Sequence, residues 1–306
     1  MKRFLCGLAA VSLLVDGVGL AQADYVFTTL DVPGSTLTEA FGINNAGQIV
    51  GTYFDGAGTA HGFFFSGGSY TTVDVPGSTR VDANGINNAG QIVGRYLDAA
   101  GTVHGFLWNS GSYTALDVPG SLATTAYGIN ASGQIVGDYR DASGLIHGFL
   151  FRGDSFTTLD VPGWIGSTAH GINNSGQIVG NGYLLSGGSY TLLNVPGANF
   201  TYPFGINDSE QIVGDYTVGP FTIHGFLLDH GSYTTIDVPG SVLSQTFGIN
   251  NAGQIVGYDI DAAGMAHAFL AAPVPEPATV FPLGIGTLGL LGYAFARRDV
   301  IPLSSA

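Results

Sequence analysis

A segment of about 43 residues occurs six times in this chain, and this repetition constrains the fold more than any other feature of the sequence. Each copy contains the pattern G-I-N-x-x-x-Q-I-V-G, accompanied by a D-V-P-G motif that reads N-V-P-G in one copy. Successive copies are 43, 43, 43, 34 and 43 residues apart. The pattern begins at Gly42, Gly85, Gly128, Gly171, Gly205 and Gly248. Repeats of this length, built from short strands and turns, are typical of β-propellers.

Each repeat divides into four predicted strands. In the first copy we expect strands at residues 40–44, 48–54, 60–65 and 69–75, separated by short turns rich in Gly, Asn, Asp and Ser. Turns this short join antiparallel neighbours, so every copy predicts a four-stranded antiparallel blade.

The phase of the repeat predicts how the ring closes. Residues 25–32 match the fourth strand of a repeat, whereas the sixth copy supplies only its first three strands. We therefore predict an all-β, six-bladed β-propeller over residues 24–272, in which the N-terminal strand completes the last blade. An open β-solenoid, the alternative, would not need this offset.

The fourth repeat is nine residues shorter than the others. Asn181-Gly182 replaces the end of its second strand, the following turn and the start of its third strand. Asn-Gly is the strongest two-residue hairpin signal, so we expect a shortened hairpin that leaves a notch in this blade.

Residues 1–23 have the features of a secretory signal peptide. Lys2 and Arg3 precede an apolar stretch at 4–15, and Ala-Gln-Ala at 21–23 forms a small-residue cleavage site. Cys6, the only cysteine, lies within this segment. The mature chain is therefore expected to contain neither disulfides nor thiol chemistry.

The C-terminal region has three consecutive parts: a P-E-P motif, an apolar segment at 278–296 and a basic pair. The motif residues are Pro275, Glu276, Pro277, Arg297 and Arg298. Nineteen residues are enough for a transmembrane helix, and the arginines would keep its end in the cytoplasm. This order resembles the PEP-CTERM sorting signal, which we assign to residues 273–306.

The resemblance implies export in a Gram-negative bacterium, usually one that makes exopolysaccharide, and processing by an exosortase. It also implies that only the C-terminal helix enters the membrane. An ordinary C-terminal anchor is the alternative. Under either reading the body of the protein faces outward, in the envelope and then at the cell surface or in the extracellular matrix.

The body is strongly acidic. Residues 24–275 contain four arginines, no lysine and nineteen acidic residues, which leaves a net charge of −15. Nucleic acid is excluded as a partner, because phosphate binding requires clustered basic residues.

The repeats also resemble the extracellular HAF repeat family, named for a His-Ala-Phe signature. The signature reads H-G-F or H-A-F here, starting at His61, His104, His147, His224 and His267. The resemblance implies an extracellular location and no established activity.

The recurring polar residues are predicted to be structural. The histidines lie on the third strand from the axis, where copies in neighbouring blades are too far apart to share a metal ion. We expect them to form hydrogen bonds within their blades. The recurring asparagines are expected to cap turns; they are Asn44, Asn87, Asn130, Asn173, Asn207 and Asn250. We predict no cofactor and no metal site, with weak Ca²⁺ binding at surface Asp-containing turns as the alternative.

The repeats differ mainly in the loops between blades and between the second and third strands, which share one face of a propeller. Loops on a rigid scaffold often carry function. The candidate ligand-binding residues there are Glu39, Arg80, Asp82, Trp164, His170, Tyr202 and Gln245. Exposed Trp164 and Tyr202 would suit stacking on sugars.

No catalytic motif is recognisable in the sequence. The leading hypothesis is therefore a non-enzymatic surface or matrix protein that binds exopolysaccharide or an envelope partner through this loop face. The competing hypothesis is a secreted carbohydrate-active lyase or hydrolase that uses acidic residues on the same face, for which Asp138 and Asp141 form a candidate pair.

Overall fold

The computed structural model describes residues 21–22, 25–219 and 222–274. The described residues form strands β1 to β25, and no helix occurs among them. Consequently none of them forms a helix that could cross a membrane. The predicted transmembrane helix at 278–296 and the sorting residues from Pro275 onward lie outside the described residues, as do residues 1–20 of the predicted signal peptide.

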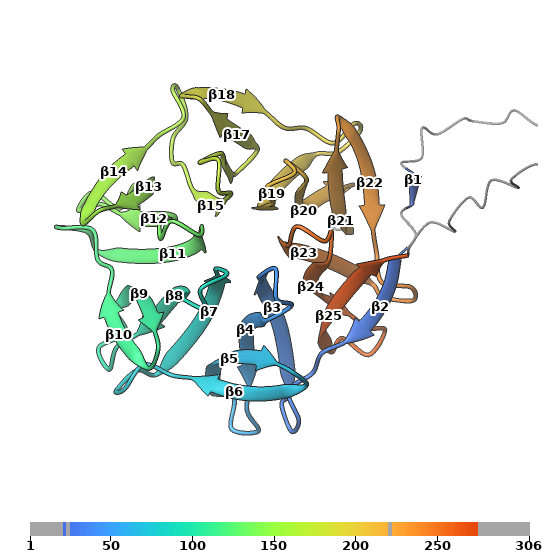
Figure 1. The fold of residues 1–306 in the computed structure, drawn as a ribbon, viewed down its shortest axis with the longest axis horizontal. Helices are drawn as coiled ribbons and strands as arrows, with labels where there is room; N and C mark the ends of the chain where they lie inside the picture. Colours follow the sequence, from blue (N-terminus) through green and yellow to red (C-terminus); the bar gives the residue numbers. More distant parts are fainter. Residues whose placement is uncertain (1–20, 23–24, 220–221, 275–306) are drawn as a thin grey trace, which may run out of the picture. The chain divides into compact units, whose positions relative to one another are not determined.

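The strands form six antiparallel sheets that surround a central axis as the blades of a propeller (Figure 1). Blade 1 contains β3 (Leu37–Ile43), β4 (Ile49–Phe54), β5 (Ala60–Ser66) and β6 (Ser69–Val73). Blade 2 contains β7 (Arg80–Ile86), β8 (Ile92–Leu97), β9 (Val103–Asn109) and β10 (Ser112–Ala115). Blade 3 contains β11 (Ala123–Ile129), β12 (Ile135–Arg140), β13 (Ile146–Arg152) and β14 (Ser155–Leu159).

The remaining blades follow the same order from the axis outward. Blade 4 contains β15 (Ala169–Ile172), β16 (Ile178–Gly180), β17 (Tyr183–Ser186) and β18 (Ser189–Leu192). Blade 5 contains β19 (Phe200–Ile206), β20 (Ile212–Val218), β21 (Thr222–Asp229) and β22 (Ser232–Ile236). Blade 6 contains β23 (Leu243–Ile249), β24 (Ile255–Ile260), β25 (Ala266–Pro273) and β2 (Tyr25–Thr29). The predicted all-β, six-bladed propeller is confirmed.

The ring closes through the N-terminal strand, as the phase of the repeat predicts. Strand β2 pairs antiparallel with β25, so that Thr29 lies opposite Phe269. This pairing removes two free sheet edges. A further two-residue strand, β1 (Ala21–Gln22), pairs in parallel with β22 and lies within the predicted signal peptide.

The shortened hairpin of blade 4 is also confirmed. Gly180 pairs with Tyr183, leaving Asn181-Gly182 as a two-residue loop. Gly182 adopts a φ of 73°, which glycine reaches without strain. The expected notch is partly filled, because the indole of Trp164 lies beside Gly182 and its ring centroid is 6.4 Å from that of Tyr183.

The core lies between neighbouring blades, where the middle strands are buried on both faces. An aromatic residue at one position of every third strand is almost completely buried, at 0–2% exposed. These residues are Phe63, Phe106, Phe149, Tyr183, Phe226 and Phe269. Each packs against the preceding blade, while the apolar residue after it, such as Phe64, packs against the following blade. Burial on both faces explains why apolar residues follow one another in the sequence instead of alternating with polar ones.

The recurring histidines form hydrogen bonds within their blades, as predicted. Each Nδ1 atom lies 2.7–2.9 Å from a carboxylate oxygen of the aspartate that begins a D-V-P-G motif. The pairs are His61–Asp74, His104–Asp117, His147–Asp160, His224–Asp237 and His267–Asp31. Within the described ranges, no group of three or more His, Cys, Asp or Glu side chains could hold a metal ion.

The recurring asparagines cap turns, as predicted, and they also join the blades. The side-chain oxygen of Asn44 accepts hydrogen bonds from the backbone N–H groups of Ala46 and Gln48, both at 3.0 Å. Its amide nitrogen donates to the backbone carbonyl of Asn87 in the next blade, at 3.0 Å. Six such bonds of 3.0–3.2 Å connect all blades, and the last runs from Asn250 back to Asn44. We call these six residues the asparagine ring.

Candidate binding site in the central channel

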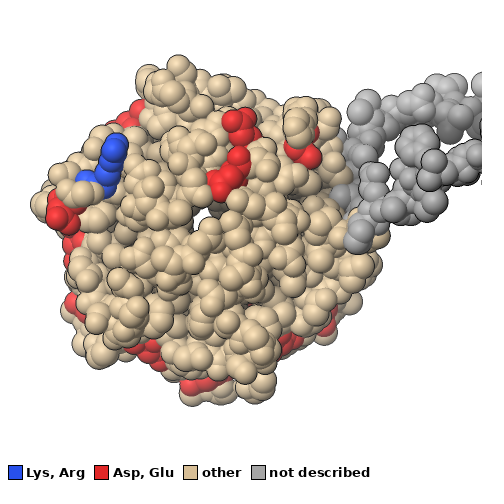
Figure 2. Space-filling view, in the orientation of Figure 1, with Lys and Arg blue, Asp and Glu red and all other residues tan. Residues whose placement is uncertain are grey.

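A cavity of about 360 Å³ lies on the axis, lined by the first strand of every blade. A small opening near the centre is visible on the face shown in Figure 2, where acidic side chains outnumber basic ones and most of the surface is uncharged. The volume is in the range of sites for small ligands. We call this cavity the central pocket.

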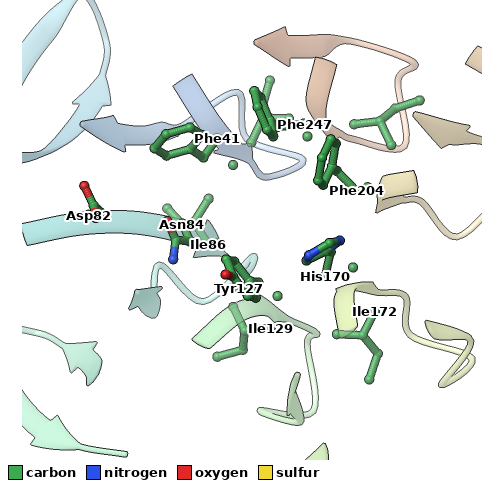
Figure 3. Close-up of a pocket in the computed structure, with 18 of the residues that line it drawn as sticks. Phe41, Asp82, Asn84, Ile86, Tyr127, Ile129, His170, Ile172, Phe204 and Phe247 are labelled. Carbon is green, nitrogen blue, oxygen red and sulfur yellow. The ribbon is translucent and has the colours of Figure 1, made fainter. Parts of the chain in front are cut away.

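A β-bulge in the first strand of each blade shapes the pocket wall. In blade 1, Ala40 pairs with Gly51 and Gly42 pairs with Val50, so that Phe41 has no partner on β4. The same irregularity occurs in the other five blades. The extra residues are Phe41, Asn84, Tyr127, His170, Phe204 and Phe247, and all of them line the pocket. Bulges redirect side chains, and Figure 3 shows the labelled residues around a shared central space. We call these six residues the collar.

Glycine follows the collar residue in every blade because neighbouring first strands approach closely. A Cβ atom added to Gly85 would lie only 2.4 Å from the carbonyl oxygen of Tyr127 in the next blade. Any side chain there would push the blades apart, which accounts for the glycine of the G-I-N pattern.

Five collar residues carry aromatic rings in consecutive contact. The ring centroids of Tyr127 and His170, and those of His170 and Phe204, are 5.0 Å apart. Phe247 continues the series, at 4.9 Å from Phe204 and 5.2 Å from Phe41. Asn84 completes the circle, and its amide donates to the backbone carbonyl of Ala126 at 2.8 Å. The collar is thus an aromatic arc with one amide.

His170 contributes a neutral ring to this arc. Burial lowers its pKa to about 4, so the imidazole is uncharged near neutral pH. Its Nδ1 atom lies 3.2 Å from the carbonyl oxygen of Pro203, which can only accept a hydrogen bond. Nδ1 therefore carries the proton, and Nε2 is left as an acceptor.

A ring of isoleucines lies between the pocket and a second, smaller cavity on the axis. Each isoleucine lies two residues after a collar residue and is only 7–8% exposed. These are Ile43, Ile86, Ile129, Ile172, Ile206 and Ile249. They also line the second cavity, of about 90 Å³, which the asparagine ring surrounds. The channel therefore narrows from the central pocket toward the turns.

Charged residues gather on the pocket wall in blades 1 and 2. Asp82, only 2% exposed, accepts hydrogen bonds from Nε of Arg80 at 3.0 Å and from Nε of Arg95 at 2.6 Å. The hydroxyl of Thr52 donates to its other oxygen at 3.1 Å. Burial alone would raise the pKa of Asp82, but the two arginines outweigh it and hold that pKa below its usual range. We call Glu39, Arg80, Asp82 and Arg95 the charged sector.

Glu39 of this sector and the nearby Asp138 have raised pKa values. Burial and the nearby Asp82 raise the pKa of Glu39, although Arg80 and Arg95 oppose the shift. Burial raises the pKa of Asp138 to about 6, even though the hydroxyl of Tyr127 donates to it at 3.3 Å. The surroundings of Arg95 therefore lose negative charge as Asp138 takes up a proton near pH 6.

The structure corrects where most of the predicted site residues lie. The sequence places all seven on loops, but six of them belong to first strands, because these strands begin several residues earlier than expected. In blade 1 the strand starts at Leu37, whereas the prediction starts at residue 40. Those that line the pocket are Glu39, Arg80, Asp82 and His170.

The other three predicted residues lie away from the central pocket. Tyr202 lies on β19, and its ring stacks beside that of Phe200 at a centroid distance of 6.2 Å. Gln245 lies on β23 and joins two blades, donating to Asp215 and accepting from the hydroxyl of Tyr258. Only Trp164 lies in a loop, as predicted, and it is 41% exposed.

Sequence reasoning missed the other collar residues and Arg95, although a signal was present. The residue before G-I-N reads F, N, Y, H, F and F in the six copies, while the ten residues after it hardly change. The residue after I-V-G varies as well, and in blade 2 it is Arg95, which lines the pocket. Variation inside the most uniform segment therefore indicates the pocket wall.

Comparison with known proteins supports the sorting signal and the fold. Residues 273–298 match the PEP-CTERM protein-sorting motif. The chain carries this exosortase sorting signal. The motif implies export to the cell envelope or surface and processing by an exosortase. No curated protein matches the chain.

Several solved structures are similar in fold. TolB from Acinetobacter baumannii has a TM-score of 0.50 and 12% identity, with 74% of this chain and 63% of that chain covered. A mutant of AofleA from Arthrobotrys oligospora has a TM-score of 0.48 and 14% identity, covering 81% of this chain and 86% of that one. An Aleuria aurantia lectin mutant in complex with α-methyl-L-fucoside has a TM-score of 0.44 and 13% identity, covering 82% and 99%. At these identities the likeness concerns the fold alone.

Proposed function

We propose that the exported protein is a non-enzymatic glycan-binding protein that holds its ligand in the central pocket. The observation that carries this proposal is the collar, in which bulges in all six blades direct five aromatic rings and one amide into one cavity. Aromatic faces pack on the C–H faces of sugar rings, and polar groups at the edge fix the hydroxyls. The charged sector supplies such groups beside the arc.

The size of the pocket limits what part of a glycan can enter. A cavity of about 360 Å³ accepts a small ligand, whereas the second cavity, beyond the isoleucines, has a volume of only about 90 Å³. We propose that a chain end or a short side branch of an exopolysaccharide enters, while the remainder of the polymer stays outside.

The scaffold favours binding without rearrangement. The asparagine ring connects every blade through backbone carbonyls, and the N-terminal strand closes the last sheet. A wall held this firmly loses little conformational entropy when a ligand enters. We also retain the proposals that the repeats are HAF repeats and that the host is a Gram-negative bacterium that makes exopolysaccharide.

One observation favours the competing function, a carbohydrate-active lyase or hydrolase. A carboxyl group with a pKa of about 6, such as that of Asp138, can act as a general acid or base near neutral pH. Its expected partner is engaged elsewhere, because Asp141 accepts hydrogen bonds from the backbone of Ser143 and Leu145 in an exposed turn. Asp138, which lies beside Tyr127 and does not itself line the pocket, would therefore need another partner.

A glycan array with the full chain, purified in mild detergent, tests the proposal. The collar variant Phe204→Leu/Phe247→Leu should weaken retention of any bound glycan by about tenfold or more, because it removes two stacking faces. The matched control is Trp164→Ala/Tyr202→Ala, which removes two aromatic rings outside the pocket and should leave retention unchanged. Circular dichroism on both variants checks that the propeller remains folded.

Two results would contradict the proposal. Loss of retention in the Trp164→Ala/Tyr202→Ala variant, with the collar variant unaffected, would move the site to the loop face. Release of reducing ends or unsaturated sugars from the retained glycan, abolished by Asp138→Asn, would establish the enzymatic alternative.

A further inference from the structure

Cationic side chains are scarce in this protein, yet two of them line the central pocket. The four arginines between residues 24 and 275 are Arg80, Arg95, Arg140 and Arg152, and no lysine occurs there. Of these, Arg80 and Arg95 belong to the charged sector and lie on the pocket wall. Because the same segment carries a net charge of −15, two arginines close together in one pocket are unexpected.

Asp82 fixes both guanidinium groups without using all of their donors. Its carboxylate contacts the Nε atom of each arginine, at 3.0 Å for Arg80 and 2.6 Å for Arg95. The side-chain hydrogen bonds found among the described residues include none from the Nη atoms of either arginine. Both side chains are 35% exposed, whereas that of Asp82 is 3% exposed. A buried anchor thus holds two guanidinium groups at the pocket with donors to spare.

We infer that the central pocket selects an acidic sugar, whose carboxylate is bound by the guanidinium groups of Arg80 and Arg95. This inference rests on the proposed glycan-binding function and names the chemical class of the ligand. The planar donor fork of a guanidinium matches the two oxygens of a carboxylate, and charge-assisted hydrogen bonds of this kind are stronger than those to a neutral hydroxyl. The neighbouring aromatic arc would pack on the face of the same sugar ring.

The charges around the two arginines make the selection dependent on pH. The carboxyl groups that face them are Asp82, Glu39 and Asp138. With all five groups ionised their net charge is −1, part of which Arg140 offsets at Asp138, so the carboxylates compete with an anionic ligand for the two arginines. Glu39 and Asp138 have raised pKa values, so they take up protons first as the pH falls. Asp82 stays ionised between its arginines, and His170 stays neutral down to a pH of about 4.

A uronate keeps its charge over the same range, because an ordinary sugar carboxyl has a pKa of about 3.5, like an α-carboxyl group. Lowering the pH from 8 to 5 therefore protonates Asp138, a carboxylate that competes for Arg95, while the ligand remains an anion. Binding of an acidic sugar should strengthen over this interval, whereas binding of a neutral sugar should change little.

The test compares matched oligosaccharides that differ in one carboxylate. The full chain in mild detergent is titrated with short oligomers of galacturonate and galactose, glucuronate and glucose, and mannuronate and mannose. We expect at least one uronate oligomer to bind about tenfold more tightly than its neutral counterpart, the gain typical of a charge-assisted hydrogen bond. Its affinity should rise as the pH falls from 8 to 5.

Three variants locate the preference. Arg95→Lys and Arg80→Lys keep the positive charge that Asp82 needs but remove the donor fork, so each should abolish most of the uronate preference while neutral binding is retained. Arg152→Gln, which removes an exposed arginine at the end of β13, is the control and should preserve the preference. Thermal unfolding of all three variants checks the fold.

The possible outcomes separate the inference from the proposed function. Binding of neutral oligomers as tightly as uronates, unaffected by Arg95→Lys, would overturn the inference and leave glycan binding in place. Equal loss of preference in Arg152→Gln would overturn it too, since the acidic group would then be recognised away from the pocket. Failure of the protein to retain any of the six oligomers or any arrayed glycan would remove both.

Discussion

The collar lies within the six first strands and the asparagine ring directly after them, three residues further along the chain, and the two differ in almost every other respect. The asparagine ring has one residue type throughout, and each member is buried and hydrogen-bonded across a blade boundary. The collar has four residue types and faces a cavity. Identical residues thus join the blades to one another, while residues that differ from blade to blade line the central pocket.

The difference shows how a repeat protein separates stability from recognition. When one hydrogen-bonding residue occurs six times around an axis, each copy can donate to the next blade. No donor or acceptor then remains free to bind a ligand. A ligand has no six-fold symmetry, and a wall that binds it must therefore break the symmetry. In this protein the break is concentrated at Asn84 and the charged sector, in blades 1 and 2.

The sharpest test of this comparison replaces two asparagines in β7 and the turn after it. Asn87→Ala removes a buried side chain that forms four hydrogen bonds, and we expect the free energy of unfolding to fall by about 3 kcal/mol. Asn84→Ala removes one hydrogen bond from the collar and should cost about 1 kcal/mol. Urea denaturation measures both. Equal losses of stability would mean that the collar and the asparagine ring do not differ in how much they stabilise the fold.

A second test uses Asp215, a variable residue after I-V-G that lies outside the pocket. Burial raises its pKa to about 8, although the backbone of Thr246 and the amide of Gln245 donate to it. A carboxyl whose pKa is raised on folding stabilises the protein at low pH, and this contribution is lost as the pH rises through the folded pKa. We expect the Tm to fall between pH 5 and 8.5.

Asp215→Asn should remove a large part of that fall, because the amide resembles the protonated carboxyl and does not ionise. Glu39 and Asp138 have raised pKa values as well, so some dependence on pH should remain. Thermal unfolding monitored by circular dichroism across the interval provides the measurement. A variant with the same pH dependence as the wild type would show that Asp215 is already ionised in the folded protein.

The smallest effect is expected at the outer strands. His104 is bonded to Asp117 and stacked on Tyr96 near the surface, so His104→Asn should lower the free energy of unfolding by about 1 kcal/mol. His230→Asn is the control, because His230 is 89% exposed and asparagine tolerates its positive φ of 47°. If His104→Asn lowered the free energy of unfolding as much as Asn87→Ala does, the outer hydrogen bonds would stabilise the fold as much as the asparagine ring.

The architecture could be predicted from the sequence because its signals are periodic and local. Turn residues recur at fixed offsets, the offset of the first strand gives the closure of blade 6, and Asn181-Gly182 gives the short hairpin. Each of these depends on backbone geometry that a few residues determine. The distance between copies on the third strand argued against a shared metal and for hydrogen bonds within each blade, but the aspartate partners became known only from the structure.

The pocket could not be predicted in the same way, because it depends on where each first strand begins and on a bulge within it. Glu39 and Asp82 look like loop residues, since the strand that carries them starts before the apolar pattern does. A bulge leaves no turn residue in the sequence, so nothing local shows that Phe41 faces the axis. The contact of Asp82 with Arg95 joins two strands, and sequence spacing alone does not give its register.

The pairing of β2 with β25 also sets the order in which the molecule can be completed. Strand β2 finds its partner only when residues 266–273 have been made, so the last sheet of the ring forms after the other five blades have been synthesised. Until then both ends of the array present open strand edges, which attract other strands and proteases. A chain interrupted before Ala266 lacks this final pairing, and it also lacks the sorting motif at residues 273–298. The sorting motif thus begins where the last strand of the propeller ends, so a chain that carries the motif also contains every strand of the ring.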